Sequence, residues 1–231
     1  MINNKGWQMN LLPTFVPLLQ KQNNKPNKAC KYYRIPDTEK LKIMVLYTKV
    51  YMFSEWLKSR SSIFNILLFL VGFITLTVFI FPYFKTHYGL QNAVLLDVLF
   101  GFSPERAYDI IASYGDYGRK GIFVITGIVD FIYPLVYGPL LALLLSRLII
   151  KLSTTINIRL INLLPFVVVL FDFIENTGIL FMTANYPAKS PPIAWLTSVA
   201  GIFKWLVTGV CIVTLLILLI KKANKKATPN N

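Results

Sequence analysis

Residues that bind metal ions or form disulfides are scarce in this sequence. Its 231 residues include one histidine, His87, and two cysteines, Cys30 and Cys211. Cys30 lies in a basic stretch and Cys211 in an apolar run, so we expect neither a disulfide framework nor a thiolate metal site. A zinc, haem or di-iron site that needs several imidazoles is excluded by the single histidine. We therefore expect no metal site and no cofactor.

Charged residues are also scarce, and acidic ones most of all. Charged residues make up 15% of the chain, against about 25% in soluble proteins. Hydrophobic residues make up 55%, the mean hydropathy is +0.56, and the net charge is +14. Such a basic charge is also typical of nucleic-acid-binding proteins, but the apolar runs favour a membrane protein instead. We expect its partners to be membrane lipids, with anionic headgroups at the cytoplasmic face, and no nucleic acid.

Four apolar runs are long enough to cross a bilayer, which takes about 20 residues in a helix. None of them alternates in polarity like a barrel strand, and only helices and closed barrels satisfy their backbone groups in lipid. The sequence therefore predicts an all-α integral membrane four-helix bundle over residues 61–222. Its spans lie at about 62–82, 121–145, 160–184 and 193–220.

Most lysines and arginines lie before the first span, between the second and third spans, and after the fourth. Cytoplasmic loops carry such an excess, and an even number of spans leaves both termini on one side. We therefore expect a multi-pass protein of the cell membrane with both termini in the cytoplasm. A basic cytoplasmic tail is expected at residues 223–231.

The segment before the first span divides in two. Residues 1–37 are rich in Asn, Lys and Pro, which predicts a disordered basic cytoplasmic tail. Residues 38–60 have a helical pattern, which predicts an amphipathic helix on the membrane surface or, alternatively, a solvated linker. Met52 would also be a sufficient start for a four-span protein. The apolar positions of the pattern are Ile43, Leu46, Tyr47, Val50, Phe53 and Leu57.

The loop over residues 84–120 contains the signals of a short extracytoplasmic helix. Ser103, Pro104 and Glu105 are typical of a helix start, and Gly115 of a helix end. The triplet Asp116-Tyr117-Gly118 then predicts a turn into the second span. This helix is either an ordinary packed connector or a lid over a cavity.

Ionisable residues inside the predicted spans are the main functional signal. A charge at a helix centre costs about 2.5–3.5 kcal/mol on insertion scales, so these side chains should face inward and meet one another. Lys204 is the only cation among them, and we expect it to pair with Asp172 or Glu175, with Asp130 facing the same cavity. Three carboxylates and one ammonium would leave an excess of negative charge, so we expect at least one carboxyl to be protonated.

Helical spacing places polar and small residues on shared faces of these spans. Residues three and four positions apart lie on one face of a helix, and Thr197 and Gly201 have the spacing that lets helices approach closely. The predicted ligand-binding residues are Asp130, Tyr133, Tyr137, Asp172, Glu175, Asn176, Lys204 and Trp205.

Residues 96–205 resemble a group of four-span prokaryotic membrane proteins without an assigned activity, so the resemblance implies a fold and no function. The plan of four helices with buried acids is also similar to that of sterol-isomerase-like membrane proteins, in architecture alone. The resemblance to the prokaryotic group lies in Leu96-Asp97, residues 101–105, Ala107-Tyr108, residues 115–119, Asp130-x-x-Tyr133-Pro134-x-x-Tyr137, Pro165, Asp172-x-x-Glu175-Asn176 and Lys204-Trp205.

Three functions remain open at this stage. The first is binding of, or action on, a lipid-like small molecule within the bundle, with Asp130, Asp172 and Glu175 as candidate acid and base groups. The second is a proton- or cation-coupled transporter or channel subunit, which would need an oligomer because the four spans show no inverted repeat. The third is an accessory membrane protein whose polar network only holds the helices together.

Overall fold

The computed structural model describes residues 38–152 and 160–227, and within them it is helical with no strand. The chain forms two compact units, residues 1–44 and 45–231, and all four spans belong to the second. The predictions of a disordered tail at residues 1–37 and of the last residues of the C-terminal tail lie outside the described residues.

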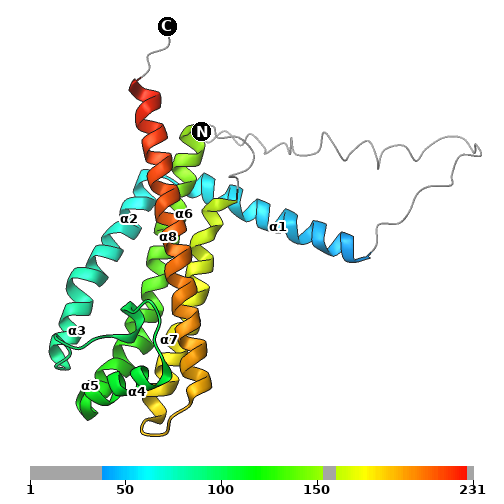
Figure 1. Ribbon diagram of the computed structural model, residues 1–231. Helices are drawn as coiled ribbons and strands as arrows, with labels where there is room; N and C mark the ends of the chain where they lie inside the picture. The colour runs from blue at the N-terminus through cyan, green and yellow to red at the C-terminus, as the bar shows by residue number, and fades with distance from the viewer. Residues whose placement is uncertain (1–37, 153–159, 228–231) are drawn as a thin grey trace, which may run out of the picture. The chain divides into compact units, whose positions relative to one another are not determined.

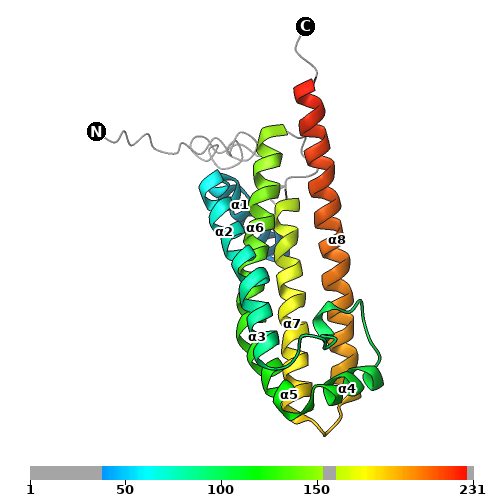
Figure 2. The ribbon, with the colours of Figure 1, turned by 90° about the vertical axis from the view of Figure 1, so that its left-hand side faces the viewer.

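Four helical segments of the second unit are long and apolar enough to cross a membrane. Figures 1 and 2 show them running side by side, with α4 at one end of the bundle and the end of α8 at the other. The protein is thus a multi-pass membrane protein with an all-α four-helix bundle, and the predicted fold class is confirmed. Span 1 comprises α2 (Ile63–Ile74), the π-helical η2 (Thr75–Ile80) and α3 (Phe81–His87); span 2 comprises α5 (Gly115–Val124), the π-helical η4 (Ile125–Val129) and α6 (Asp130–Leu152); span 3 comprises η6 (Ile161–Leu163) and α7 (Leu164–Asn185); span 4 lies in α8 (Pro191–Ala227).

Glycines set the close packing of α7 on α8 and of α6 on α7. A Cβ atom at Gly178 of α7 would overlap the side chain of Thr197 on α8, and one at Gly201 of α8 would overlap the Glu175 carboxylate. Gly138 of α6 is likewise in contact with Val169 of α7. Small residues allow such approach where no hydrophobic effect drives helices together in lipid. The predicted close approach at Thr197 and Gly201 is confirmed.

Span 1 is attached to the bundle differently. It packs against α6, yet none of the residues of α2, η2 or α3 is fully buried. Spans 2, 3 and 4 each bury several side chains. Span 1 is therefore the peripheral helix of the bundle.

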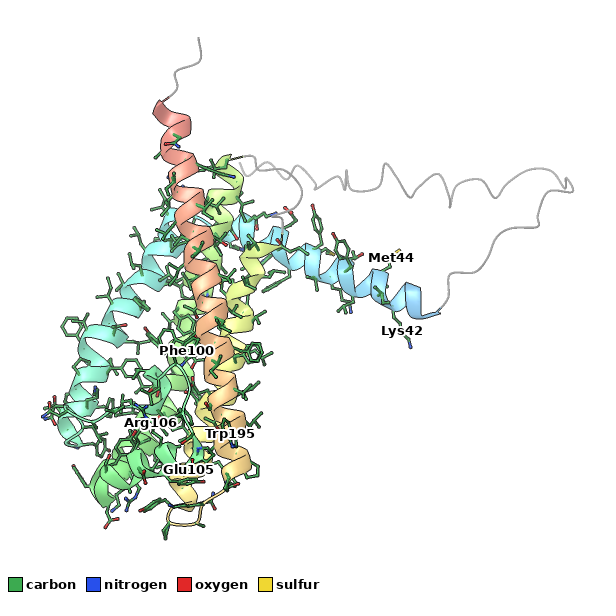
Figure 3. The ribbon with its side chains drawn as sticks, in the orientation of Figure 1. Lys42, Met44, Phe100, Glu105, Arg106 and Trp195 are labelled. Atoms are coloured by element: carbon green, nitrogen blue, oxygen red, sulfur yellow. The ribbon has the colours of Figure 1, made fainter. Side chains whose placement is uncertain are left out.

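The segment between spans 1 and 2 packs onto the end of the bundle. Helix α4 (Pro104–Ser113) begins where predicted, with the Ser103 hydroxyl accepting a hydrogen bond from the Arg106 backbone N–H at 3.3 Å. Its apolar face buries Tyr108 and Ile111, while Glu105 is exposed at its first turn (Figure 3). The predicted turn over residues 116–118 is wrong. Gly115, at a φ of +64°, makes the reversal, and α5 begins at Gly115 itself.

A helix is confirmed for residues 38–60, because α1 spans Thr38–Arg60. Its role on the membrane surface stays a prediction.

Within the second unit, the end of α1 joins a buried polar network that includes none of Asp130, Asp172 and Glu175. The Ser54 hydroxyl donates to Asn162 Oδ1 at 2.8 Å, and Asn162 Nδ2 donates to the Ser146 hydroxyl at 2.9 Å. Arg147 donates to the Ser61 carbonyl at 2.7 Å.

Candidate functional site

The predicted ion pairs of Lys204 are present in the bundle. Its Nζ lies 2.5 Å from Glu175 Oε2 and 3.5 Å from Asp172 Oδ1. Glu175 is 0% exposed, Asp172 6% and Lys204 8%. One ammonium thus joins two carboxylates of span 3 to span 4. This confirms that Lys204, Asp172 and Glu175 meet one another instead of facing lipid, whereas Asp130 is in none of these ion pairs.

Hydrogen bonds extend this cluster to span 2. The Tyr137 hydroxyl donates to Asp172 Oδ2 at 2.7 Å, and Asn176 Nδ2 donates to the Asp130 carbonyl at 2.9 Å. Tyr137 and Asp130 both belong to α6, seven residues apart, as the helical spacing predicted. We refer to Asp130, Tyr137, Asp172, Glu175, Asn176 and Lys204 as the polar cluster.

Three buried atoms of the polar cluster lack hydrogen-bond partners among the described residues: Glu175 Oε1, Glu175 Oε2 and Asn176 Oδ1. Of these, Glu175 Oε2 has the Lys204 ion pair instead. A buried polar atom without a partner is costly, and each instance in a folded protein calls for a reason. The Lys204 ammonium contacts only the Oε2 atom of Glu175. Its other N–H groups point to Asp172 Oδ1 and to the Asp97 carbonyl, which accepts a hydrogen bond at 2.9 Å.

A cavity of about 680 Å³ lies beside the polar cluster; we call it the central cavity. Spans 1 and 4 supply much of its wall, α6 and residues 95–98 supply most of the rest, and Asp172 comes from α7. Its polar lining consists of Asp97, Asp130, Asp172, Lys85, Lys204, Thr77, Thr208, Tyr133 and Tyr137. Its apolar lining consists of Leu70, Phe73, Phe81, Pro82, Leu95, Val98, Leu140, Leu141, Trp205 and Ile212.

Six of the eight predicted binding residues line the central cavity. Glu175 and Asn176 do not, because they lie behind Asp172 and Lys204, packed against α8 and α6. Their contacts make them supports for the residues in the wall. The six in the wall are Asp130, Tyr133, Tyr137, Asp172, Lys204 and Trp205.

Asp97 is a cavity residue that reasoning from hydropathy missed. It lies on η3 (Leu96–Val98), a single turn in the segment between spans 1 and 2, so no apolar run surrounds it. The contact of Lys204 with its carbonyl holds this turn over the bundle. Burial raises the pKa of the Asp97 carboxyl, and the Lys204 ammonium opposes that rise. The only sequence signal was the pair Leu96-Asp97 within the resemblance to four-span prokaryotic proteins.

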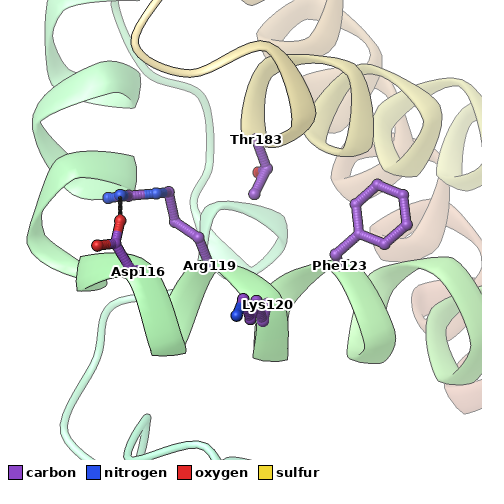
Figure 4. A pocket seen from close by; sticks show the side chains of 5 residues that line it. All are labelled: Asp116, Arg119, Lys120, Phe123 and Thr183. Carbon is purple, nitrogen blue, oxygen red and sulfur yellow. Dashed lines mark hydrogen bonds and ion pairs between the residues drawn. The ribbon is translucent and has the colours of Figure 1, made fainter.

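A second, shallower cavity of about 420 Å³ lies between α5 and the end of α7 (Figure 4). Two of its three charged side chains are already engaged: Arg119 forms an ion pair with Asp116, and its guanidinium carbon lies 4.5 Å from the centroid of the Tyr186 ring. None of its lining residues belongs to the polar cluster. We therefore take the central cavity as the candidate site.

The described residues contain no group of three or more His, Cys, Asp or Glu side chains arranged to hold a metal ion. The central cavity offers carboxyl groups that exchange protons, tyrosine hydroxyls and two ammonium groups, those of Lys85 and Lys204.

No family model, no curated protein and no solved structure matches the chain. The suggested relation to four-span prokaryotic proteins therefore stays a prediction.

Proposed function

We propose that the protein binds a lipid-like amphiphile in the central cavity, in a membrane that it crosses four times. The supporting observation is that the cavity wall combines ten apolar side chains with charged and hydroxyl-bearing ones. The volume of about 680 Å³ also falls in the range of small-molecule sites, about 300–1,000 Å³. An amphiphile would place its tail against Leu70, Phe73 and Ile212, and its polar group near Asp130 and Asp172.

The position of span 1 supports a route from the bilayer. Leu70 and Phe73 of span 1 and Trp205 and Ile212 of span 4 line the same cavity. Because span 1 packs on α6 and has no fully buried residue, its separation from α8 would disrupt little packing. We propose that the amphiphile enters between spans 1 and 4.

The packing at the other end of the bundle argues against a pore through a single copy of the chain. There Leu145, Leu148, Ile149 and Leu218 form a buried apolar cluster. A proton or cation that reached the polar cluster would meet this apolar packing on its way to the far side. Binding, with acid–base chemistry by Asp97, Asp130 or Asp172 on the bound molecule, therefore fits the geometry better than conduction.

Filling the cavity tests the proposal. Leu141→Trp places an indole at the cavity wall, whereas Leu135→Trp on the same helix places one on an exposed face, because Leu135 is 57% exposed. We expect the wild type and Leu135→Trp to retain a co-purifying amphiphile in native mass spectrometry, and Leu141→Trp to lose most of it. Equal retention by the two tryptophan variants would show that the amphiphile binds elsewhere.

We further propose that the protein lies in the cell membrane with both termini in the cytoplasm. The distribution of its basic residues supports this orientation. In a background free of Cys30 and Cys211, Glu105→Cys should react in intact cells with a maleimide that cannot cross membranes. Thr155→Cys should react only after lysis. Glu105 suits the test because its side chain is exposed. Reversed labelling would contradict the proposed orientation, and the four-helix fold would still stand.

A further inference from the structure

The charges of the central cavity and polar cluster do not balance. Four carboxyl groups, Asp97, Asp130, Asp172 and Glu175, lie in or directly behind the cavity wall, against two ammonium groups, Lys85 and Lys204. Such a site carries an excess of negative charge when all four carboxyls are ionised, and either protonation or a bound cation neutralises it.

The Lys204 ammonium is already used by two of these carboxyls. It lies within ion-pair distance of Glu175 and Asp172. Within the described residues, no lysine, arginine or histidine nitrogen lies within 4.0 Å of the side-chain oxygens of Asp97 or Asp130. Asp130 is nevertheless only 6% exposed, and it lines the cavity. Its buried carboxyl therefore faces the cavity without a counter-cation.

Aromatic rings lie around the same part of the cavity. The Tyr133 ring stacks on Phe73 at 5.6 Å between centroids and meets the edge of Phe81 at 5.2 Å. Tyr137 lies 5.2 Å from Tyr133 in an edge arrangement. The faces of aromatic rings attract cations, and most strongly where water is excluded.

We propose that the amphiphile is cationic: an amine or quaternary ammonium on an apolar tail, with its positive charge between Asp97 and Asp130 and beside Tyr133. This inference rests on the proposed function and names the chemistry of the ligand. A bare metal ion fits less well, because the described residues form no metal-ligating group of three or more and much of the cavity wall is apolar.

A matched pair of photoactivatable probes tests the charge. One is a hexadecylamine that carries a diazirine in its chain, and the other is the N-acetyl amide of the same molecule, which is neutral. The full chain is irradiated with each probe in maltoside micelles, whose headgroups carry no ammonium. Labelling of cavity residues is measured by peptide mass spectrometry relative to Phe64 and Val210, which are exposed on spans 1 and 4. This comparison corrects for partition of the probes into the micelle.

The amine should label the cavity at least about tenfold more than the amide, because only the amine gains ion pairing and cation–π contact. Asp130→Asn and, independently, Asp97→Asn should each lower amine labelling toward the amide level. The control Asp109→Asn removes an exposed carboxylate on α4 and should change nothing. Testing Asp97 separately keeps the result readable if Asp130→Asn fails to fold.

The outcomes separate the two proposals. If both probes label the cavity equally, the cationic ligand is wrong and amphiphile binding stands. If neither labels the cavity more than Phe64 and Val210, amphiphile binding itself is wrong. If the amine is favoured but neither Asp97→Asn nor Asp130→Asn reduces its labelling, the assignment of the charge to these carboxyls is overturned.

Discussion

Lys204→Met is expected to lower the free energy of unfolding by about 3–5 kcal/mol, the usual cost of removing one member of a buried ion pair. The loss is large here because Glu175 is 0% exposed and its Oε1 already lacks a hydrogen-bond partner. Without the ammonium, Glu175 Oε2 would lose its ion pair as well. The measurement is the unfolding of the purified protein by dodecyl sulfate in mixed micelles, followed by circular dichroism.

A second substitution should restore part of this loss. Lys204→Met with Glu175→Gln removes the buried negative charge that the first change leaves unpaired, so the double variant should be more stable than Lys204→Met alone. Asp172→Asn should restore less, because Asp172 lies farther from Lys204, at 3.5 Å, and still accepts from Tyr137. Lys85→Met is the matched control, with a half-buried lysine at the cavity wall and no ion pair within 4.0 Å among the described residues. If the single and double variants are equally unstable, the charges do not interact as described.

Gly201→Ala is also expected to have a large effect. It should lower the free energy of unfolding by about 1–3 kcal/mol, the usual cost of overpacking. The added methyl group would overlap the Glu175 carboxylate. Either α8 moves away from α7 or Glu175 moves away from Lys204, and both weaken the polar cluster. The same unfolding assay measures the loss.

Gly209→Ala on the same helix is the control for Gly201→Ala. Among the described residues, no atom beyond the adjacent residues and the local backbone of α8 lies within 4 Å of the position that its Cβ would occupy. This variant should therefore be as stable as the wild type or slightly more so, since alanine favours helices over glycine. Similar losses for both variants would mean that helix α8 is sensitive to any added methyl group, and that the contact with Glu175 is not the cause.

The polar cluster was predictable because a charged side chain that faces lipid costs free energy. Asp130, Asp172, Glu175 and Lys204 lie in the middle of apolar runs, and the cost of leaving them in lipid requires that they meet. Helical spacing then placed Tyr137 on the face of Asp130, where it reaches Asp172. The same reasoning could not tell which side chains line a cavity and which stand behind it, as Glu175 and Asn176 do.

Features that depend on how whole segments pack together could not be predicted from the sequence. Asp97 lies in a loop without periodicity, and only the folding of that loop onto α8 brings it to Lys204. The peripheral position of span 1 was also hidden, because its run of apolar residues looks like that of any buried span. The reversal at Gly115 replaced the predicted turn at residues 116–118, since one residue with positive φ was enough to redirect the chain.

A crystal structure of the full chain grown in a lipidic mesophase tests the central claim most directly, because it shows the polar cluster and the contents of the cavity together. The expected result is Lys204 between Glu175 and Asp172, with an elongated molecule between span 1 and α8 and its polar end within about 4 Å of Asp130, the reach of an ion pair. The account would be contradicted by α2 packed directly on α8 with no cavity between them, or by Lys204 facing lipid.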